Sequence, residues 1–471
     1  MFRLLAALAL CATPVAAQEK PKNVIVMIAD GAGYNMLAAT RMWTGAKLFA
    51  DGDEWQRASL ATYALRNGPE GEGQDPDLVY TSEKAWDVRP LSGDSECATG
   101  YAAGFAGYEW HRCTHPDSAN TMSAMVTGTR TYNGAVNVDG SGTPELSAAE
   151  TAKATGRRVG SITTVPFSHA TPAAGGGAHN VSRNNYHEIA AEMLESPTLD
   201  FIAGGGHPNF DSDGNRVGDQ ATAKERFRWL SSESWSALND GSSGWTLIQT
   251  RDEIDDLGRY GGDDRVIVLP PVAAAMQVER AAAEGHDPKT DAPGEAKLLK
   301  TVPSLTELAE AALTHLDQER GFFLSIEGGA VDWAMHANML GRAIEEYEDF
   351  DAAVAAVAAW LDDPATPASW ENTLVIVTAD HDHLLFGPDV DEPFQPLEWH
   401  GAGAMPGYRW WSNSHSAQLV PFFARGAGAD RLITEADEVD QMRSADGTAR
   451  GRGRYLTQPE MGAAILELLS R

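Results

Sequence analysis

The segment TLVIVTADH at residues 373–381 is an almost unbroken apolar run that ends in Asp380 and His381, two residues able to bind a metal ion. Such a run is typical of a strand inside a parallel sheet, because helices cover both of its faces. Three other segments have the same form and also end in polar residues, at 23–30, 159–165 and 321–327. Helical patterns occupy residues 304–316 and 343–360. The alternation predicts an α/β fold, a three-layer sandwich with a mainly parallel central sheet.

Two regions depart from this alternation. Residues from about 66 to 115 are rich in Gly, Asp and Glu and contain two cysteines, so we interpret them as an inserted Cys-containing segment. Residues from about 204 to 301 are polar and weakly periodic, which indicates a peripheral lobe. The other segments are expected to form the sheet, and the carboxyl ends of its strands are expected to collect residues from distant parts of the chain into one site.

The N-terminus has the pattern of an export signal. Arg3 precedes an apolar run at 4–12, and small residues at 15–17 fit a cleavage site before Gln18. We therefore expect residues 1–17 to be removed and the mature domain, 18–471, to be periplasmic or secreted. Cleavage would leave Cys97 and Cys113 in a compartment that permits disulfides, so a bridge between them is expected; two separate buried thiols are the alternative.

The composition is strongly acidic, with a formal net charge of −31 at pH 7. Nucleic acid and anionic membrane would both be repelled, so neither is an expected partner. Small anionic substrates would be repelled as well, which means that a site for them must carry positive charge of its own. Bound metal ions and an arginine are the groups that would supply it.

Two potential metal-binding motifs follow predicted strands. Asp30 leaves the first predicted strand into a loop whose glycines permit close approach of a ligand. Asp332 and His336 are four residues apart, so a helical turn would put both on one face, where they could grip one ion. Glu327 stands just upstream, at the end of a predicted strand.

A third motif is the pair Asp380 and His381. Adjacent side chains of a strand point to opposite faces, so these two can share an ion only if the strand ends there and the chain turns. We expect His383, two residues further on, to orient a ligand rather than to bind metal itself.

The candidate nucleophile is Ser118, at the start of a helix of small residues. The positive end of the helix dipole favours an alkoxide or a bound phosphate there. The alternative is that Asp117 or Ser118 only caps the helix. A second Asp-Ser pair, at 94–95, is rejected because Glu96 would set a carboxylate beside the bound anion. Thr171 offers a hard oxygen suited to magnesium, and Arg183 offers a planar fork that grips phosphate oxygens in pairs.

In their order along the chain, these motifs resemble those of the alkaline phosphatase family, from about Pro21 to the C-terminus. The resemblance is most specific in the Asp-Ser-Ala of 117–119, in 327–336, in 378–381 and in the histidine of the segment NSHS at 413–416. It implies two zinc ions and one magnesium ion, with these ligands: Asp332, His336 and His415 for one zinc, Asp30, Asp380 and His381 for the second, and Asp30, Thr171 and Glu327 for magnesium. His169 and Trp333 stand beside these ligands, where other members carry Asp and Lys, which leaves magnesium or cobalt as the third metal.

The resemblance implies a phosphomonoesterase that hydrolyses small phosphate monoesters through a phosphoserine at Ser118, while Arg183 holds the phosphate oxygens. Because many relatives are dimers, a homodimer is one expected state. A phosphodiesterase of the same superfamily is the alternative, although those enzymes generally lack the third metal site. An inactive secreted binding protein would be expected to have lost the nucleophile or a ligand set, and every expected position is filled.

Overall fold

The computed structural model describes residues 20–68, 73–87, 109–218, 221–257, 264–390, 394–443 and 447–470. The predicted export signal, the Asp-Ser pair at 94–95 and Cys97 lie outside these ranges. The signal and the bridge from Cys97 to Cys113 therefore stay predictions. Among the described residues, no helix is both long and apolar enough to cross a membrane.

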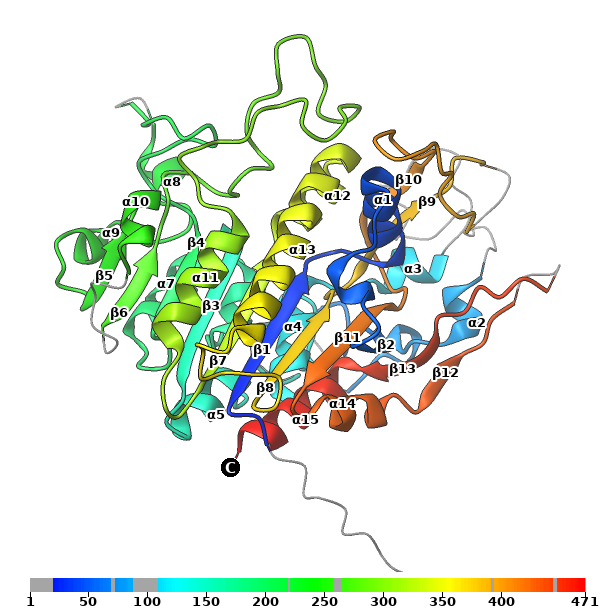
Figure 1. Cartoon of the computed structure of the whole chain (residues 1–471), viewed down its shortest axis with the longest axis horizontal. Helices are drawn as coiled ribbons and strands as arrows, with labels where there is room; N and C mark the ends of the chain where they lie inside the picture. The colour runs from blue at the N-terminus through cyan, green and yellow to red at the C-terminus, as the bar shows by residue number, and fades with distance from the viewer. Residues whose placement is uncertain are drawn as a thin grey trace, which may run out of the picture.

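A central sheet crosses the molecule (Figure 1), and the described residues give it eleven strands in the order β12-β13-β2-β11-β8-β1-β7-β3-β4-β6-β5. Most neighbours are parallel, whereas β11 is antiparallel to β8 and β2, and β12 is antiparallel to β13. The bounds are β1 (Asn23–Ala29), β2 (Gln56–Ala61), β3 (Arg158–Pro166), β4 (Phe201–Gly205), β5 (Trp245–Ile248), β6 (Arg265–Val268), β7 (Phe322–Gly328), β8 (Thr373–Thr378), β11 (Val420–Gly426), β12 (Glu438–Asp440) and β13 (Gly453–Thr457).

The four central strands are buried along their whole length. Side chains on both faces therefore need to be apolar, and this is why unbroken apolar runs identified the strands. Together with helices on both faces of the sheet, this confirms the predicted α/β sandwich with a mainly parallel sheet.

Helices cover both faces of the sheet (Figure 1). α1 (Tyr34–Thr44), α11 (Leu305–Leu316) and α13 (Leu340–Asp362) pack together on one face, and α4 (Ser118–Thr127), α5 (Ala148–Ala154), α6 (Ala170–Gly175) and α15 (Gln458–Leu469) lie on the other. α11 begins where the sequence predicts, because Ser304 and Glu307 form a reciprocal capping box at its start. The remaining helices are short or peripheral: α2 (Ser82–Ala85), α3 (Glu109–Thr114), α7 (Tyr186–Glu195), α8 (Ala223–Arg226), α9 (Ser232–Asn239), α10 (Arg251–Asp255), α12 (Ala330–His336) and α14 (Ala429–Glu435).

A separate antiparallel pair, β9 (Asp382–Phe386) and β10 (Arg409–Ser416), lies beyond the carboxyl end of β8. Its register sets His415 opposite His383 and Ser416 opposite Asp382. The pairing of β9 with β10 thus brings His383 and His415, which are distant in sequence, next to each other.

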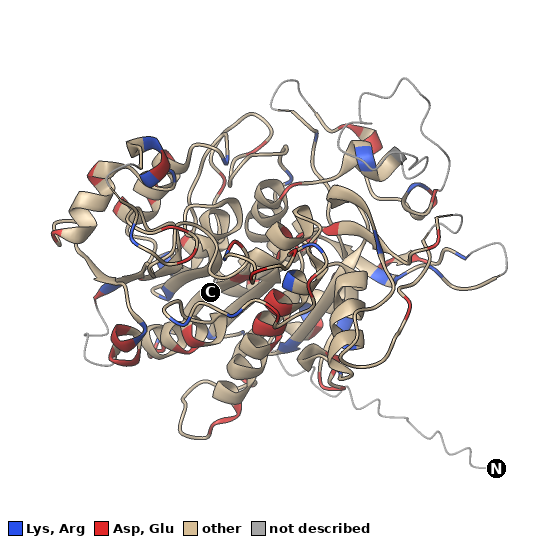
Figure 2. Cartoon of the chain, turned by 90° about the horizontal axis from the view of Figure 1, so that it is seen from above, with Lys and Arg blue, Asp and Glu red and all other residues tan. Residues whose placement is uncertain are grey.

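Residues 204–301, predicted to be a peripheral lobe, contribute β5 and β6 to the edge of the sheet and otherwise form short helices and loops. These two strands have only four residues each, which explains the weak periodicity of the region. Acidic residues are spread over helices and loops around the molecule (Figure 2), as expected from the net charge of −31.

Candidate active site

The carboxyl ends of β1, β7 and β8 lie side by side, because β1 pairs with both of the other strands. Asp30 directly follows β1, Glu327 lies at the end of β7, and Asp380 comes two residues after β8. In the parallel register, Ile28 of β1 is opposite both Glu327 and Thr378. The sheet therefore brings three predicted metal ligands to one point.

The first cluster contains Asp30, Asp380 and His381, which are fully buried and whose ligand atoms lie within 4.8 Å of one another. Nε2 of His381 is 3.3 Å from Oδ1 of Asp30 and 3.2 Å from Oδ2 of Asp380. β8 ends at Thr378, so the chain turns where the sequence analysis required a turn. Oδ1 of Asp380 fixes this turn by accepting 2.9 Å hydrogen bonds from the backbone N–H groups of Gly31 and His381.

The second cluster is centred on Asp332 of α12. Its Oδ1 lies 2.7 Å from Nε2 of His383 and 3.3 Å from Nε2 of His415, and its Oδ2 lies 3.4 Å from Nε2 of His336. The ligand atoms of Asp332, His381, His383 and His415 all lie within 4.8 Å of one another. The 2.7 Å contact between His383 and Asp332 is a hydrogen bond of the kind that an orienting histidine makes, so the expectation that His383 orients a ligand stays a prediction. His336 is the more exposed histidine, and its Nε2 contacts Nε2 of His415 at 2.9 Å.

A third group of potential metal ligands consists of buried oxygens of Asp30, Thr171 and Glu327. Both carboxylate oxygens of Asp30, Oγ1 of Thr171 and Oε1 of Glu327 are buried and have no hydrogen-bond partner among the described residues. The other oxygen of Glu327 accepts a hydrogen bond from Thr163. Buried oxygens without partners are costly unless a cation or another donor satisfies them. Hard oxygen donors of this kind fit magnesium.

The electrostatics of the site also favour bound cations. Burial, followed by the negative charges of Asp380, Asp332 and Glu327, raises the pKa of Asp30 well above its usual value. Burial likewise raises the pKa of Glu327 to about 7 and that of Asp380 to about 6. Carboxyl groups this close resist ionisation together, and metal cations would stabilise their charged forms.

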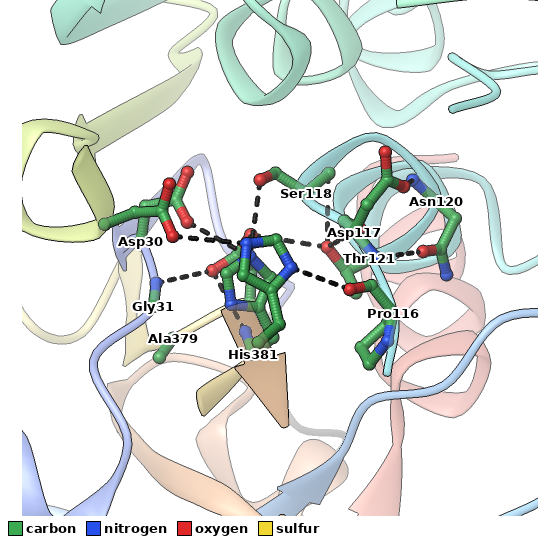
Figure 3. Close-up of polar contacts among 12 residues, drawn as sticks. Asp30, Gly31, Pro116, Asp117, Ser118, Asn120, Thr121, Ala379 and His381 are labelled. Carbon is green, nitrogen blue, oxygen red and sulfur yellow. Dashed lines mark hydrogen bonds and ion pairs between the residues drawn. The ribbon is translucent and has the colours of Figure 1, made fainter. Parts of the chain in front are cut away.

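Ser118 is the first residue of α4, and Asp117 is the residue that caps the helix (Figure 3). Oδ1 of Asp117 accepts a 3.0 Å hydrogen bond from the N–H of Asn120, so the serine hydroxyl is not needed as a cap. Oγ of Ser118 instead lies 3.3 Å from Nε2 of His381, inside the first cluster. The hydroxyl is thus next to the potential metal ligands of the first cluster and at the positive end of the dipole of α4.

Arg183 is held by Asp117, the same residue that caps α4. Its Nη1 donates a 2.9 Å hydrogen bond to Oδ2 of Asp117, and its Nη2 lies 3.3 Å from Nε2 of His169. Asp117 therefore links the nucleophile's helix to the guanidinium predicted to bind phosphate.

His169 and Trp333 lie against each other, with ring centroids 5.5 Å apart. Burial, together with the charge of Arg183, lowers the pKa of His169 to about 3, so its imidazole is neutral near pH 7. Neither His169 nor Trp333 therefore adds charge beside the potential metal-binding oxygens of Asp30, Thr171 and Glu327. Two further rings, Tyr186 and Trp229, pack around His169.

Two contacts of the site could not be predicted from the sequence: the anchoring of Arg183 by Asp117, and the contact of Thr163 with Glu327. Thr163 is opposite Glu327 because β3 is the neighbour of β7, and sequence alone does not reveal which strands are neighbours. The position of Asp117 directly before the candidate nucleophile does mark it as a candidate site residue. Its partner Arg183, however, lies 66 residues further along the chain, so the sequence does not reveal that contact.

Comparison with known proteins agrees with this geometry. The family model for alkaline phosphatase matches residues 106–398. Alkaline phosphatase 3 of Bacillus subtilis is 30% identical over 446 residues, which cover 91% of this chain and 73% of the relative. Alkaline phosphatase 4 of the same organism is 32% identical over 282 residues, covering 57% of this chain and 51% of the relative.

Solved structures show the same fold. The alkaline phosphatase of the Antarctic bacterium TAB5 superposes with a TM-score of 0.61 at 22% identity, covering 96% of this chain and 99% of that one. The Thermus thermophilus alkaline phosphatase gives a TM-score of 0.60 at 18% identity, covering 99% and 96%. From the family match, the similarity to the Bacillus enzyme and the shared fold, the chain belongs to the alkaline phosphatase family and is a phosphatase.

Proposed function

We propose that the protein hydrolyses phosphate monoesters through a phosphoserine at Ser118, using zinc and magnesium. The observation that carries this proposal is the position of Oγ of Ser118, 3.3 Å from His381 and at the start of α4, beside two clusters of metal-binding side chains. Arg183, fixed by Asp117, supplies the cationic fork for the phosphate oxygens.

The proposed reaction has two displacements at phosphorus. Oγ of Ser118 attacks as its proton leaves, and the ester oxygen departs and takes up a proton to become the alcohol. A water molecule then attacks the phosphoserine, the bond from phosphorus to Oγ breaks, and inorganic phosphate is released. Arg183 stabilises the negative charge on the nonbridging oxygens in both displacements.

Metal ions would be held by side chains that already converge. Asp30, Asp380 and His381 would hold one zinc, and Asp332 would hold the second with His415 and either His336 or His383. Asp30, Thr171 and Glu327 offer oxygens for magnesium, or for cobalt. When bound, the divalent ions would supply Lewis-acid stabilisation of the attacking and leaving oxygens.

The proposal is tested with p-nitrophenyl phosphate and bis-p-nitrophenyl phosphate at alkaline pH. Wild type is expected to turn over the monoester faster than the diester, and Ser118→Ala to lower kcat for the monoester by about 10³-fold or more. A chelator should abolish turnover, and zinc plus magnesium should restore it. Faster turnover of the diester would instead support the phosphodiesterase alternative.

Export and assembly belong to the same proposal. We expect the mature protein to begin near Gln18, to reside in the periplasm or outside the cell, and to form a homodimer. Sequencing the N-terminus of the exported protein and measuring its mass in solution by light scattering test these points.

A further inference from the structure

A cavity of about 940 Å³ opens between α13, the start of α11 and the loop at 293–302. Its walls also include Trp43 at the end of α1. None of the ligands described above lines it, so it is distinct from the candidate active site. The volume lies in the range that accommodates a small organic molecule.

The loop over the cavity is anchored at Ala296 and Leu299. Gln277 exchanges two hydrogen bonds with the backbone of Leu299, at 2.9 and 3.1 Å. Arg280 donates to the carbonyl of Ala296 at 3.0 Å and to Glu345 of α13 at 2.6 Å. These hydrogen bonds fix the position of the loop at 293–302, called the arch below, relative to α13.

Glu346 is a nearly buried acidic residue that lines the cavity. Its side chain is only 5% exposed, and its Oε1 has no hydrogen bond in the described structure. Two of the other acidic groups that line the cavity are occupied, because Glu345 pairs with Arg280, and Glu307 pairs with Arg251. A buried carboxyl group that faces a cavity and lacks a partner is a position where a ligand can supply the missing donor.

The rest of the lining fits an apolar ligand. Leu298 is exposed, Leu299 and Trp43 are partly buried, and all three border the cavity. Trp43 offers an aromatic face, which attracts cations as well as apolar groups. We propose that this cavity binds an organic cation, a molecule with an apolar body and an ammonium group, and that the ammonium group pairs with Glu346.

A cation fits better than an anion because the acidic groups lie on the helix that forms the floor. Glu346 and Glu348 form no ion pair among the described residues, and both belong to α13. Lys297 and Lys300 belong to the arch and are exposed to solvent. The ionised form of Glu346, which would attract a cation, would repel an anion, so burial of an anion beside it is unfavourable.

Binding should also depend on pH. Burial, together with the charge of Asp349, raises the pKa of Glu346 to about 8, so the carboxyl group is largely protonated at pH 7. Pairing with an ammonium group requires the ionised form, so affinity rises as the pH approaches and passes 8. The charged groups that face Glu346 are Asp349, Glu345 and Arg342 of α13, Arg280 from the loop before the arch, and, around the cavity, Glu307, Glu348, Arg251, Lys297 and Lys300.

The test is calorimetric titration of the metal-loaded full-length mature protein with phenethylammonium, in the presence of saturating inorganic phosphate to occupy the active site. Its neutral counterpart, 2-phenylethanol, has the same apolar body. Phenethylammonium should bind about 10-fold more tightly than 2-phenylethanol, and Glu346→Gln should remove that advantage. Affinity should increase from about pH 6.5 to about pH 8.5 in wild type and stay constant in Glu346→Gln.

The matched control is Glu284→Gln, which removes an exposed carboxylate outside the cavity lining and should leave binding unchanged. Turnover of p-nitrophenyl phosphate and the melting temperature show whether each variant is folded. Absence of phenethylammonium binding in wild type, equal affinity of wild type for the alcohol and the ammonium, or a Glu346→Gln variant that still prefers the ammonium would each overturn the proposal.

Discussion

At the residue scale, Asp117 has two tasks that meet at the candidate active site. One oxygen caps α4 and so fixes the backbone at Ser118, and the other holds Arg183 at 2.9 Å. Burial alone would raise the pKa of Asp117, but the charge of Arg183 and several hydrogen bonds outweigh it and keep the carboxyl group ionised. The side chain therefore couples the direction of the nucleophile to the position of the phosphate-binding cation.

We predict that Asp117→Asn raises KM for p-nitrophenyl phosphate by about 10-fold, because the amide can still cap the helix but loses the charged bond to Arg183. kcat should change less than KM. The inhibition constant of inorganic phosphate, measured in the same assays, should rise in parallel. In an Arg183→Ala background the change should have little further effect, and full additivity of the two substitutions would contradict the coupling.

At the scale of elements, the pair β9–β10 brings His383 and His415 to the site, and its register depends on neighbouring contacts. Ser416 donates a 2.6 Å hydrogen bond to Asp382 one position away from the two histidines. Asp382 in turn occupies the space beside Gly33, where an added Cβ would lie 1.6 Å from its Oδ1. The start of α1 is thus fitted to this strand pair.

Gly33→Ala is expected to displace Asp382 and to lower kcat/KM by about 10-fold through poorer placement of the two histidines. Metal analysis after dialysis against a weak chelator should show faster loss of metal than in wild type. Gly218→Ala is the control, since among the described residues, apart from its chain neighbours, no atom lies within 4 Å of its added Cβ. Equal metal retention and activity in the two variants would refute this role of Gly33.

A second element-scale contact joins α5 to α7 through His179. Its Nδ1 lies 2.9 Å from Glu192 and its Nε2 lies 3.4 Å from Glu150. Burial disfavours the imidazolium, but the two carboxylates outweigh burial and raise the pKa of His179 to about 10. Because the folded pKa is above the usual value of about 6.5, the stabilisation is complete below that value and disappears as pH rises through about 10.

We therefore expect His179→Gln to lower the melting temperature most near pH 6, with the difference from wild type shrinking steadily toward pH 10. Calorimetric scans at several pH values measure this difference. A difference that does not change with pH would mean that His179 contributes through packing and not through its charge.

At the scale of the whole molecule, the net charge of −31 opposes the approach of an anionic substrate. Raising the salt concentration from about 0.01 M to about 0.1 M shortens the screening length from about 30 Å to about 10 Å. KM for p-nitrophenyl phosphate should fall over this range while kcat stays nearly constant. A KM that rises with salt would show that local attraction by the site dominates the long-range repulsion.

The central sheet could be predicted because β1, β3, β7 and β8 are covered on both faces, which leaves an unmistakable apolar pattern. β9 and β10 could not, since both carry polar residues at the site instead of an unbroken apolar run, and their pairing joins residues about thirty positions apart. The predicted ligands came from short motifs, with Asp30, Asp380 and His381 at strand ends and Asp332 and His336 at helical spacing. The contacts of Thr163 with Glu327 and of Asp117 with Arg183 depend on which elements are neighbours, and local sequence does not encode that information directly.

The proposed mechanism requires that Ser118 carries the phosphoryl group during turnover. The most direct measurement is to mix the metal-loaded enzyme with a phosphate monoester, stop the reaction with acid, and map phosphorylated peptides by mass spectrometry. We predict a phosphate on Ser118 in wild type and none in Ser118→Ala. Rapid monoester turnover with no phosphate on Ser118 at any time, or with phosphate on a different residue, would contradict the account.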